Sequence, residues 1–452
     1  MSKLKVILFC CTLFFINSLS AQSKSKKPNI IFILADDLGI GNISAYGADN
    51  FKTPIIDQLA NDGMQFSNAY AAPLCGPSRA LILTGRYAFR TGATNQDRVT
   101  QLTPTTEQLT PTYLKSAGYV TSAIGKWSQF ALTPADFGFD DYLQFYKSGV
   151  YWSTEEKAIK YAENGTDKKL PLGVYMPDLM HDHLVSFLGK NKKKPFFVHY
   201  ALSNVHTPIL PTPDSKSENK NNEAALFADN ISYMDKLVGK LLHVLDSMKL
   251  RENTMIVFMG DNGTSAGAVA QSTVHGKALS GKKGSMKECG SLVPMIFNWP
   301  GKIKSGFIST QLIDASDLLP TFVELSGANM KAHVVVDGKS FAPMLLGKNA
   351  KPRDWIFMEL GNDWYVRDQH WKLNKAGELY NMDNAPFEEN LITTANETTA
   401  SSAARAHLAE ILANLNPAAG IVDDGDGSGR HANKKDKKEK KDKKEKKDSE
   451  GE

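Results

Sequence analysis

Four short runs of largely apolar residues, each followed by polar or ionisable side chains, stand out along the chain. They span residues 30–35, 119–124, 196–200 and 255–259. Continuous apolar runs of this length suit strands that are buried on both faces, as in a parallel sheet. Segments with helical periodicity separate them, which is typical of strands joined by crossover helices. The pattern therefore predicts an α/β fold built on a large mixed, mostly parallel sheet that is flanked by helices.

Two helices between these runs can be placed from their end signals and apolar stripes. Thr53 and Pro54 supply an N-cap and a first-turn proline, and Gly63 ends the first helix. A longer helix is predicted over residues 224–249. Its apolar stripe consists of Ile231, Met234, Val238, Leu241, Leu242 and Leu245. We expect this stripe to pack into the core and to have no other role.

After about residue 335 the apolar runs become shorter. Residues 364–367, 370–373 and 378–381 have the pattern of short antiparallel strands, and a helix is expected over 400–414. The chain therefore divides into a large α/β domain of residues 27–335 and a smaller C-terminal α+β domain of residues 336–416, which contains an antiparallel sheet.

The two ends of the chain differ in sequence pattern from these two domains, which together form the body of the chain. Residues 1–21 have the pattern of a signal peptide, with Lys3 and Lys5 before an apolar stretch that is too short to span a membrane. We therefore expect an exported, periplasmic or extracellular protein without an integral membrane span in the mature chain; an uncleaved anchor is the alternative. Residues 417–452 are predicted to be disordered, with a linker at 423–429 and a Lys, Glu and Asp repeat that has nothing apolar to bury.

Net charge and cysteine count narrow the function classes. The formal charge is +4, but ten lysines and seven acidic residues of the tail and two lysines of the signal peptide account for the excess. The body is close to neutral, so we expect no nucleic-acid partner. Removing the signal peptide leaves Cys75 and Cys289, which form one disulfide at most. One of these thiols is thus a candidate for chemistry.

Carboxylates follow two of the four apolar runs. Asp36 and Asp37 come after the first run, and Asp261 and Asn262 come after the fourth. Open α/β sheets place their sites at the carboxyl ends of the strands, so these side chains should converge. Carboxylate and amide oxygens suit Ca²⁺ or Mg²⁺. The alternative is that they are turn and cap residues, but their position at two buried strands favours a metal site.

The segment from Cys75 to Arg86 is the most specific motif. Cys75-Gly76-Pro77-Ser78-Arg79, followed by Thr84-Gly85-Arg86, resembles the signature of the type I sulfatases of the alkaline phosphatase-like superfamily. The resemblance implies that a formylglycine-generating or sulfatase-maturing enzyme oxidises Cys75 to formylglycine (3-oxoalanine), whose hydrate is the nucleophile. It also implies a sulfuric ester hydrolase, and a sulfated saccharide is the expected substrate.

The resemblance extends over residues 27–395 and implies roles for further residues. Gly125-Lys126-Trp127, His206-Thr207-Pro208 and Lys283-Gly284-Ser285 are similar to family motifs. The implied catalytic residues are Cys75, Arg79, Lys126, His206 and Lys283. The implied ligands of one Ca²⁺ per chain, with Mg²⁺ as the weaker expectation, are Asp36, Asp37, Asp261, Asn262 and an oxygen of modified Cys75. His181, His183 and His199 are expected to be structural.

Three positions depart from the family pattern. Ser128 stands where the family usually has a histidine that contacts the formylglycine hydroxyl, and serine does not act as a base near neutral pH without a partner. Cys289 replaces a glycine and Leu292 an arginine, which we expect to alter pocket shape. Alternative functions are an arylsulfatase acting on small esters, a phosphodiesterase or phosphonate hydrolase, and an inactive exported glycan-binding protein.

Overall fold

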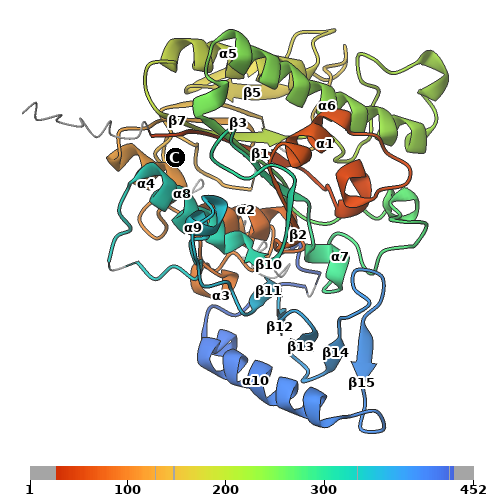
Figure 1. The fold of residues 1–452 in the computed structure, drawn as a ribbon. Coiled ribbons are helices and arrows are strands. Elements are labelled where there is room, and N and C mark those ends of the chain that lie inside the picture. Colours follow the sequence, from red (N-terminus) through yellow and green to blue (C-terminus); the bar gives the residue numbers. More distant parts are fainter. Residues whose placement is uncertain (1–26, 128, 146–147, 333, 427, 432–452) are drawn as a thin grey trace, which may run out of the picture.

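A ten-stranded sheet forms the centre of the computed structural model, which describes residues 27–127, 129–145, 148–332, 334–426 and 428–431 (Figure 1). The strand order is β10-β2-β9-β8-β1-β7-β3-β4-β5-β6. The strands are β1 (Asn29–Ala35), β2 (Met64–Tyr70), β3 (Val120–Lys126), β4 (Asp141–Phe145), β5 (Lys160–Glu163), β6 (Thr166–Lys169), β7 (Phe196–Leu202), β8 (Thr254–Gly260), β9 (Met295–Asn298) and β10 (Phe307–Asp314).

The four predicted apolar runs are the adjacent strands β8, β1, β7 and β3 at the middle of this sheet. All three pairings among them are parallel, and Ile33 of β1 lies opposite Tyr200 of β7 and Phe258 of β8. β9 pairs antiparallel with both of its neighbours, so the sheet is mixed. The predicted fold class is confirmed, and the carboxyl ends of the four central strands share one edge.

Alternate residues of β1 face two separate cores. Ile31, Ile33 and Ala35 pack in a core that also contains residues of α1 (Pro54–Asn61), α5 (Met176–Asn191) and α6 (Glu223–Ser247). Ile30, Phe32 and Leu34 pack in a core that contains residues of α2 (Cys75–Thr84), α4 (Thr110–Ser116) and α8 (Leu318–Ser326). Figure 1 shows these two helical layers on opposite sides of the sheet. Burial on both faces explains why β1 is continuously apolar.

Both helices predicted between the runs are present. α1 begins at Pro54, and α6 ends at Ser247. The Asn222 side chain accepts a hydrogen bond from the Ala225 amide and so caps α6. The predicted α6 stripe is buried except for the half-buried Leu242. Three further short helices are α3 (Ala88–Thr91), α7 (Glu288–Ser291) and α9 (Ala342–Leu345).

A five-stranded antiparallel sheet forms the C-terminal region, as the sequence predicted. Its strands are β11 (Ile356–Leu360), β12 (Asp363–Arg367), β13 (Trp371–Asn374), β14 (Leu379–Asn381) and β15 (Asn390–Ile392). α10 (Thr399–Leu415) covers this sheet, with Leu408 and Ile411 packed against Val366 and Leu373. Phe341 and Leu345, which follow the expected boundary at residue 335, pack in the core of the large sheet.

Residues 421–426 and 428–431, which we call the C-terminal strap, lie against the large domain. The Ile421 amide donates to the Phe89 carbonyl at 2.7 Å, and the buried carboxylate of Asp423 accepts from Thr94 Oγ1 at 2.8 Å and from Asn95. These residues belong to the segment for which the sequence analysis expects disorder from residue 417 with a linker at 423–429, and the structure gives them defined hydrogen bonds. Hydrogen bonding by Asp423, rather than apolar burial, anchors the strap, and an apolar pattern does not reveal it.

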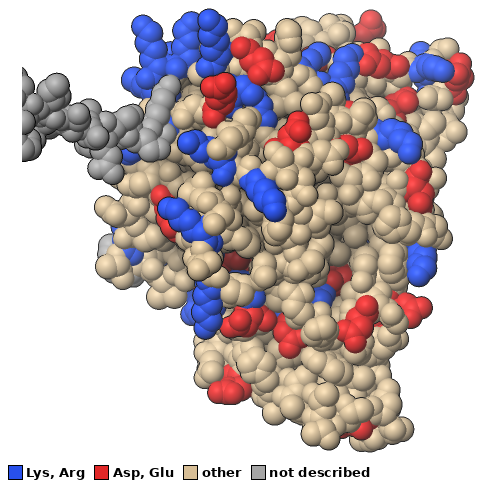
Figure 2. All heavy atoms as spheres, viewed as in Figure 1, with Lys and Arg blue, Asp and Glu red and all other residues tan. Residues whose placement is uncertain are grey.

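The predicted signal peptide and the charged repeat fall on residues 1–26 and 432–452, outside the part of the chain that the structure describes. Within that part, no helix is long and apolar enough to cross a membrane. Figure 2 shows acidic and basic side chains interspersed over the upper part of the displayed face. This mixed distribution agrees with the nearly neutral charge of the body.

Candidate active site

The nine residues predicted for the site lie together at the carboxyl edge of the central strands. Asp36 and Asp37 follow β1, Asp261 and Asn262 follow β8, and Lys126 ends β3. The remaining members come from the start of α2, the loop after β7 and the loop before α7, and they are Cys75, Arg79, His206 and Lys283. Segments that are far apart in the sequence thus deliver polar side chains to one edge of the sheet.

Cys75 is the first residue of α2 and is buried. The backbone around it is tightly enclosed, because a β-carbon at Gly76 would lie 2.6 Å from Gln96 Oε1. Sγ of Cys75 and carboxylate oxygens of Asp36 and Asp261 all lie within 4.8 Å of one another. The positive end of the helix dipole and the carboxylate cluster therefore meet at this side chain.

Arg79 lies one helical turn after Cys75, so both side chains are on the same face of α2. Its Nε and Nη2 donate to Oδ2 of Asp261 at 3.1 and 2.8 Å, and its Nη1 donates to the Lys126 carbonyl at 3.2 Å. Nη2 also lies 3.7 Å from Oδ1 of Asp36. The guanidinium therefore ties α2 to the ends of β1, β3 and β8.

Asp36 and Asp261 are fully buried carboxylates with opposite pKa shifts. Burial alone would raise the pKa of Asp36, but the positive charges around it, that of Lys126 first, outweigh it and hold that pKa well below its usual value. Both carboxylate oxygens of Asp36 accept from Lys126 Nζ at 2.7 Å. Burial, together with the negative charge of Asp36, raises the pKa of Asp261 to about 6. Cations are needed here to keep both groups ionised.

The oxygens at this edge fit a hard divalent cation. Oδ1 of Asn262 is buried and has no hydrogen-bond partner among the described residues, whereas its Nδ2 donates to Oδ1 of Asp37 at 3.1 Å. A buried amide oxygen without a partner costs free energy unless something binds it. The Asp37 amide donates to Oδ1 of Asp261 at 2.9 Å, which needs a left-handed backbone at Asp37 with φ 59°. This set of oxygens suits Ca²⁺ or Mg²⁺.

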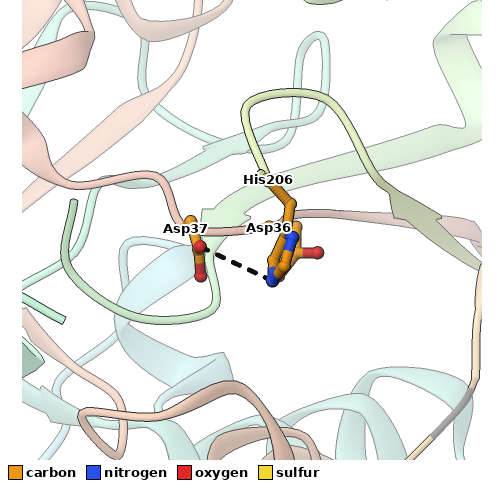
Figure 3. A group of neighbouring side chains, drawn as sticks. All are labelled: Asp36, Asp37 and His206. Atoms are coloured by element: carbon orange, nitrogen blue, oxygen red, sulfur yellow. Dashed lines mark ion pairs between the residues drawn. The ribbon is translucent and has the colours of Figure 1, made fainter. Parts of the chain in front are cut away.

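His206 and Lys283 complete the cluster, and Figure 3 shows His206 beside Asp36 and Asp37. Lys283 Nζ lies 2.6 Å from Oδ1 and 2.7 Å from Oδ2 of Asp37. Nε2 of His206 lies 3.4 Å from Lys283 Nζ and 3.7 Å from Oδ2 of Asp37. Nδ1 of His206 is 2.6 Å from the Thr207 carbonyl, which assigns the proton to Nδ1 and turns Nε2 toward the carboxylates.

Tyr151 holds the loop that carries His206. The Oη of Tyr151, which is fully buried, lies 2.6 Å from the Ser203 carbonyl and 2.9 Å from the His206 carbonyl. Burial lowers the pKa of His206, although the charges of Asp36 and Asp37 oppose the shift. The imidazole is therefore fixed in orientation and is held neutral more strongly than a solvated histidine.

Two glutamines that the sequence analysis missed contact the cysteine. Gln96 accepts from the Gly76 amide at 2.9 Å through Oε1, and its Nε2 lies 3.4 Å from Sγ of Cys75. The Nε2 of Gln129, which is buried, lies 3.9 Å from the same sulfur. Gln96 has no motif around it, whereas Gln129 adjoins position 128, where the pattern departs from the family. Ser128 itself lies outside the described residues.

The loop that carries Lys283 is joined to the end of β8 by backbone contacts. The Lys283 amide donates to the Thr264 carbonyl at 2.9 Å, and the Gly263 amide donates to the Gly290 carbonyl at 3.0 Å. A β-carbon at Gly263 would lie 1.8 Å from the Cys289 carbonyl oxygen, so only glycine fits there. This close approach brings Lys283 to the carboxylate cluster. Cys289 is buried and unpaired, and burial raises its pKa.

Within the described residues, the three histidines set aside in the sequence analysis make no hydrogen bond or ion pair with this cluster. His199 is buried within β7 between Phe32 and Trp127, and burial lowers its pKa to about 3. Nε2 of His183 lies 2.8 Å from Oδ2 of Asp141, and His181 is buried in α5. The packing of all three is that of structural side chains.

Two family models match the chain. The model described as Sulfatase matches residues 28–328. The model described as N-sulphoglucosamine sulphohydrolase, C-terminal, matches residues 281–415. The first match contains all nine residues of the cluster, and the second extends from the Lys283 loop to the end of α10.

Relatives of known activity and a solved structure are similar over most of the chain. Identity to arylsulfatase D of Homo sapiens is 27%, over 84% of this chain and 80% of that protein. Identity to N-acetylgalactosamine-6-sulfatase of Homo sapiens is 31%, over 73% of this chain and 67% of that protein. The crystal structure of Ps i-CgsB in complex with k-i-k-neocarrahexaose gives a TM-score of 0.76 at 29% identity, over 86% of this chain and 93% of that one.

Proposed function

Because the chain belongs to the sulfatase family and is a sulfuric ester hydrolase, a type I sulfatase of the alkaline phosphatase-like superfamily, we propose that it removes sulfate from a sulfated saccharide. The nucleophile is formylglycine at position 75, and one Ca²⁺ is bound beside it, with Mg²⁺ as the weaker candidate. The observation that carries this proposal is the convergence of Sγ of Cys75 with carboxylate oxygens of Asp36 and Asp261 within 4.8 Å.

The proposed metal ligands are the oxygens of Asp36, Asp37, Asp261, Asn262 and residue 75. The unpartnered Oδ1 of Asn262 supports this assignment. A bound divalent cation would offset the negative charge of the sulfate oxygens and lower the pKa of an adjacent hydroxyl. Arg79, which already bridges Asp261 and the Lys126 carbonyl, holds the modified side chain in line with this cluster.

Lys126 and Lys283 are the proposed sulfate-binding cations. Both ammonium groups lie at the cluster, where Lys126 contacts Asp36 and Lys283 contacts Asp37. Two fixed positive charges on the sulfate oxygens stabilise the negative charge that develops as the S–O bond breaks. Because the carboxylates hold both cations in place, little reorganisation accompanies substrate binding.

His206, in its imidazolium form with a second proton on Nε2, is the proposed acid that protonates the leaving sugar alcohol. Its Nε2 faces the cluster, and Thr207 and Tyr151 fix the orientation of the ring and its loop. A positioned general acid increases the rate by about 10²–10⁴-fold. Since burial lowers the pKa of His206, Lys283, whose Nζ is 3.4 Å away, is a second proton source at this point.

The saccharide part of the proposal rests on similarity. One relative is an N-acetylgalactosamine-6-sulfatase, and a similar solved structure binds a neocarrahexaose. The signal-peptide pattern of residues 1–21 supports export to the periplasm or the outside, where sulfated polysaccharides and their fragments occur. Conversion of Cys75 to formylglycine requires a formylglycine-generating or sulfatase-maturing enzyme as a partner of the chain.

The test is sulfate release from a panel of sulfated oligosaccharides, small aryl sulfates and phosphate diesters. We expect release from oligosaccharides, and we expect Cys75→Ala to abolish it. Cys289→Ala is the matched control, because it removes the other cysteine of the mature chain and should retain activity. Mass spectrometry of the peptide that contains residue 75 should detect formylglycine. An unmodified thiol in native protein, or full activity in Cys75→Ala, would contradict the proposal.

A further inference from the structure

The C-terminal strap contacts a residue that packs against the proposed nucleophile. The Gln96 amide donates to the Gly429 carbonyl at 3.3 Å, and the side chain of the same glutamine contacts Sγ of Cys75. Gly429 is buried against Leu360, where a β-carbon would lie 2.5 Å from Leu360 Cγ. Arg430 therefore directly follows the residue whose carbonyl is bonded to Gln96, which contacts Cys75.

The guanidinium of Arg430 lies beside the Lys283 loop. A β-carbon at Gly284 would lie 3.9 Å from Arg430 Nη2 and would meet no other described atom within 4 Å. The Gly284 amide donates to the Pro73 carbonyl at 2.7 Å, two residues before Cys75. The Arg430 guanidinium is thus at the rim formed by the two loops that supply Lys283 and the nucleophile.

The charge of Arg430 is not neutralised within the described part of the chain. Arg430 is exposed, and no carboxylate there lies within ion-pair distance of it. The acidic groups of the strap have other contacts, because Asp423 bonds to Thr94 and Asp424 pairs with Arg98. A guanidinium presents a planar set of donors that binds sulfate or carboxylate oxygens in pairs.

We propose that Arg430 binds a second anionic substituent of the substrate, a sulfate or carboxylate on the saccharide that carries the scissile sulfate ester. The inference rests on the proposed function, since it adds a specificity-determining residue to the same site. The strap then serves as one wall of the saccharide site, and its anchors, Asp423 and the Gly429 carbonyl, set the position of the guanidinium.

The test compares two saccharides that differ only in a second sulfate group. In the native enzyme we expect a higher kcat/KM for the disulfated saccharide. In Arg430→Gln the ratio of the two kcat/KM values should fall by about tenfold, mainly through KM, because a charge-assisted hydrogen bond is lost. Arg430→Lys should retain part of the ratio. Arg405→Gln, which removes an arginine on α10 that pairs with Glu397, should leave the ratio unchanged.

Calorimetric titration of both saccharides into Cys75→Ala protein, with and without Arg430→Gln, gives a readout that does not require turnover. A native ratio in Arg430→Gln, together with unchanged relative affinities in the titration, would overturn the proposal. If the native enzyme releases no sulfate from any saccharide, the proposed function fails. The titration would then still decide whether Arg430 selects the disulfated ligand.

Discussion

Arg79 and Asp261 are joined by two hydrogen bonds, in which Nε and Nη2 of the guanidinium donate to the same carboxylate oxygen at 3.1 and 2.8 Å. This contact connects the helix that begins with Cys75 to the loop that follows β8. The guanidinium is 2% exposed, so solvent screens the contact little. The positions of the proposed nucleophile and of a proposed metal ligand are therefore linked directly.

Replacing Arg79 by lysine should reduce kcat about 10²-fold, because a lysine cannot make the paired contact and the nucleophile moves out of line. The charge is kept, so the loss reports geometry rather than net charge. Steady-state kinetics on a sulfated saccharide measures it. Arg405→Lys on α10 is the control and should leave kcat unchanged. A native kcat in Arg79→Lys would show that the guanidinium does not position the nucleophile.

Lys283→Ala should lower kcat by about 10²–10³-fold. It removes a positive charge aimed at the sulfate and leaves the Asp37 carboxylate without the ion pair that offsets its negative charge. Lys282→Ala removes the neighbouring, exposed lysine and serves as the matched control. Both variants are assayed for sulfate release and for formylglycine content. Equal losses in the two variants would point to a change in the loop rather than to the Lys283 charge.

Gln96→Ala should lower kcat about tenfold, because the amide that contacts residue 75 and accepts from Gly76 is lost. Gln101→Ala, at an exposed position in the same segment, is the control. Formylglycine content is measured in parallel, because impaired oxidation of Cys75 would also reduce activity. A normal formylglycine content with native kcat would exclude a positioning role for Gln96.

Removal of the metal should abolish sulfate release and lower the melting temperature. Without the cation, the buried carboxylates of Asp36, Asp37 and Asp261 repel one another, and the Asn262 amide oxygen has no partner. Dialysis against a chelator followed by activity assay and thermal unfolding tests this. Added Ca²⁺ should restore both properties more fully than Mg²⁺. Full activity in protein shown by elemental analysis to be metal-free would contradict the metal site.

Glu359 should make stability depend on pH. Burial raises the pKa of this carboxyl to about 8 from an ordinary value of 4.5, while the Phe89 amide donates to it. The folded protein binds the proton on Glu359 more strongly than the unfolded chain does. The stabilisation that Glu359 contributes therefore has its full value below about pH 4.5. It is lost as the pH rises to about 8. Glu359→Gln, which keeps an acceptor for Phe89, should remove this part of the pH dependence.

Thermal unfolding of both proteins from pH 5 to pH 8.5 measures the effect. The difference in stability between Glu359→Gln and native protein should grow in favour of the variant as the pH rises, by up to a few kcal/mol. Glu410→Gln, at an exposed position on α10, should show no such trend. A constant difference across this range would mean that Glu359 is ionised in the folded protein.

The sequence alone predicted the central sheet because its strands are buried on both faces, so their apolar runs are continuous. It also predicted that Asp36 and Asp261 meet, since the carboxyl ends of adjacent parallel strands share an edge. Gln96 escaped prediction because its contact with Cys75 depends on the path of the loop after α3. Asp423 escaped because a segment rich in glycine and aspartate has the composition of a linker, although its hydrogen bonds are made to residues 94 and 95.

The strap also places a proposed substrate-binding residue far along the sequence from the residues assigned to the chemistry. Every group assigned to the chemistry lies between residues 36 and 283, whereas the guanidinium at the rim comes from residue 430. Frameshifts, extensions or recombination near the 3′ end can thus alter which sulfated saccharides are accepted while the codons for the reaction machinery stay untouched. Related proteins with divergent C-terminal segments should accordingly differ more in substrate range than in catalytic chemistry.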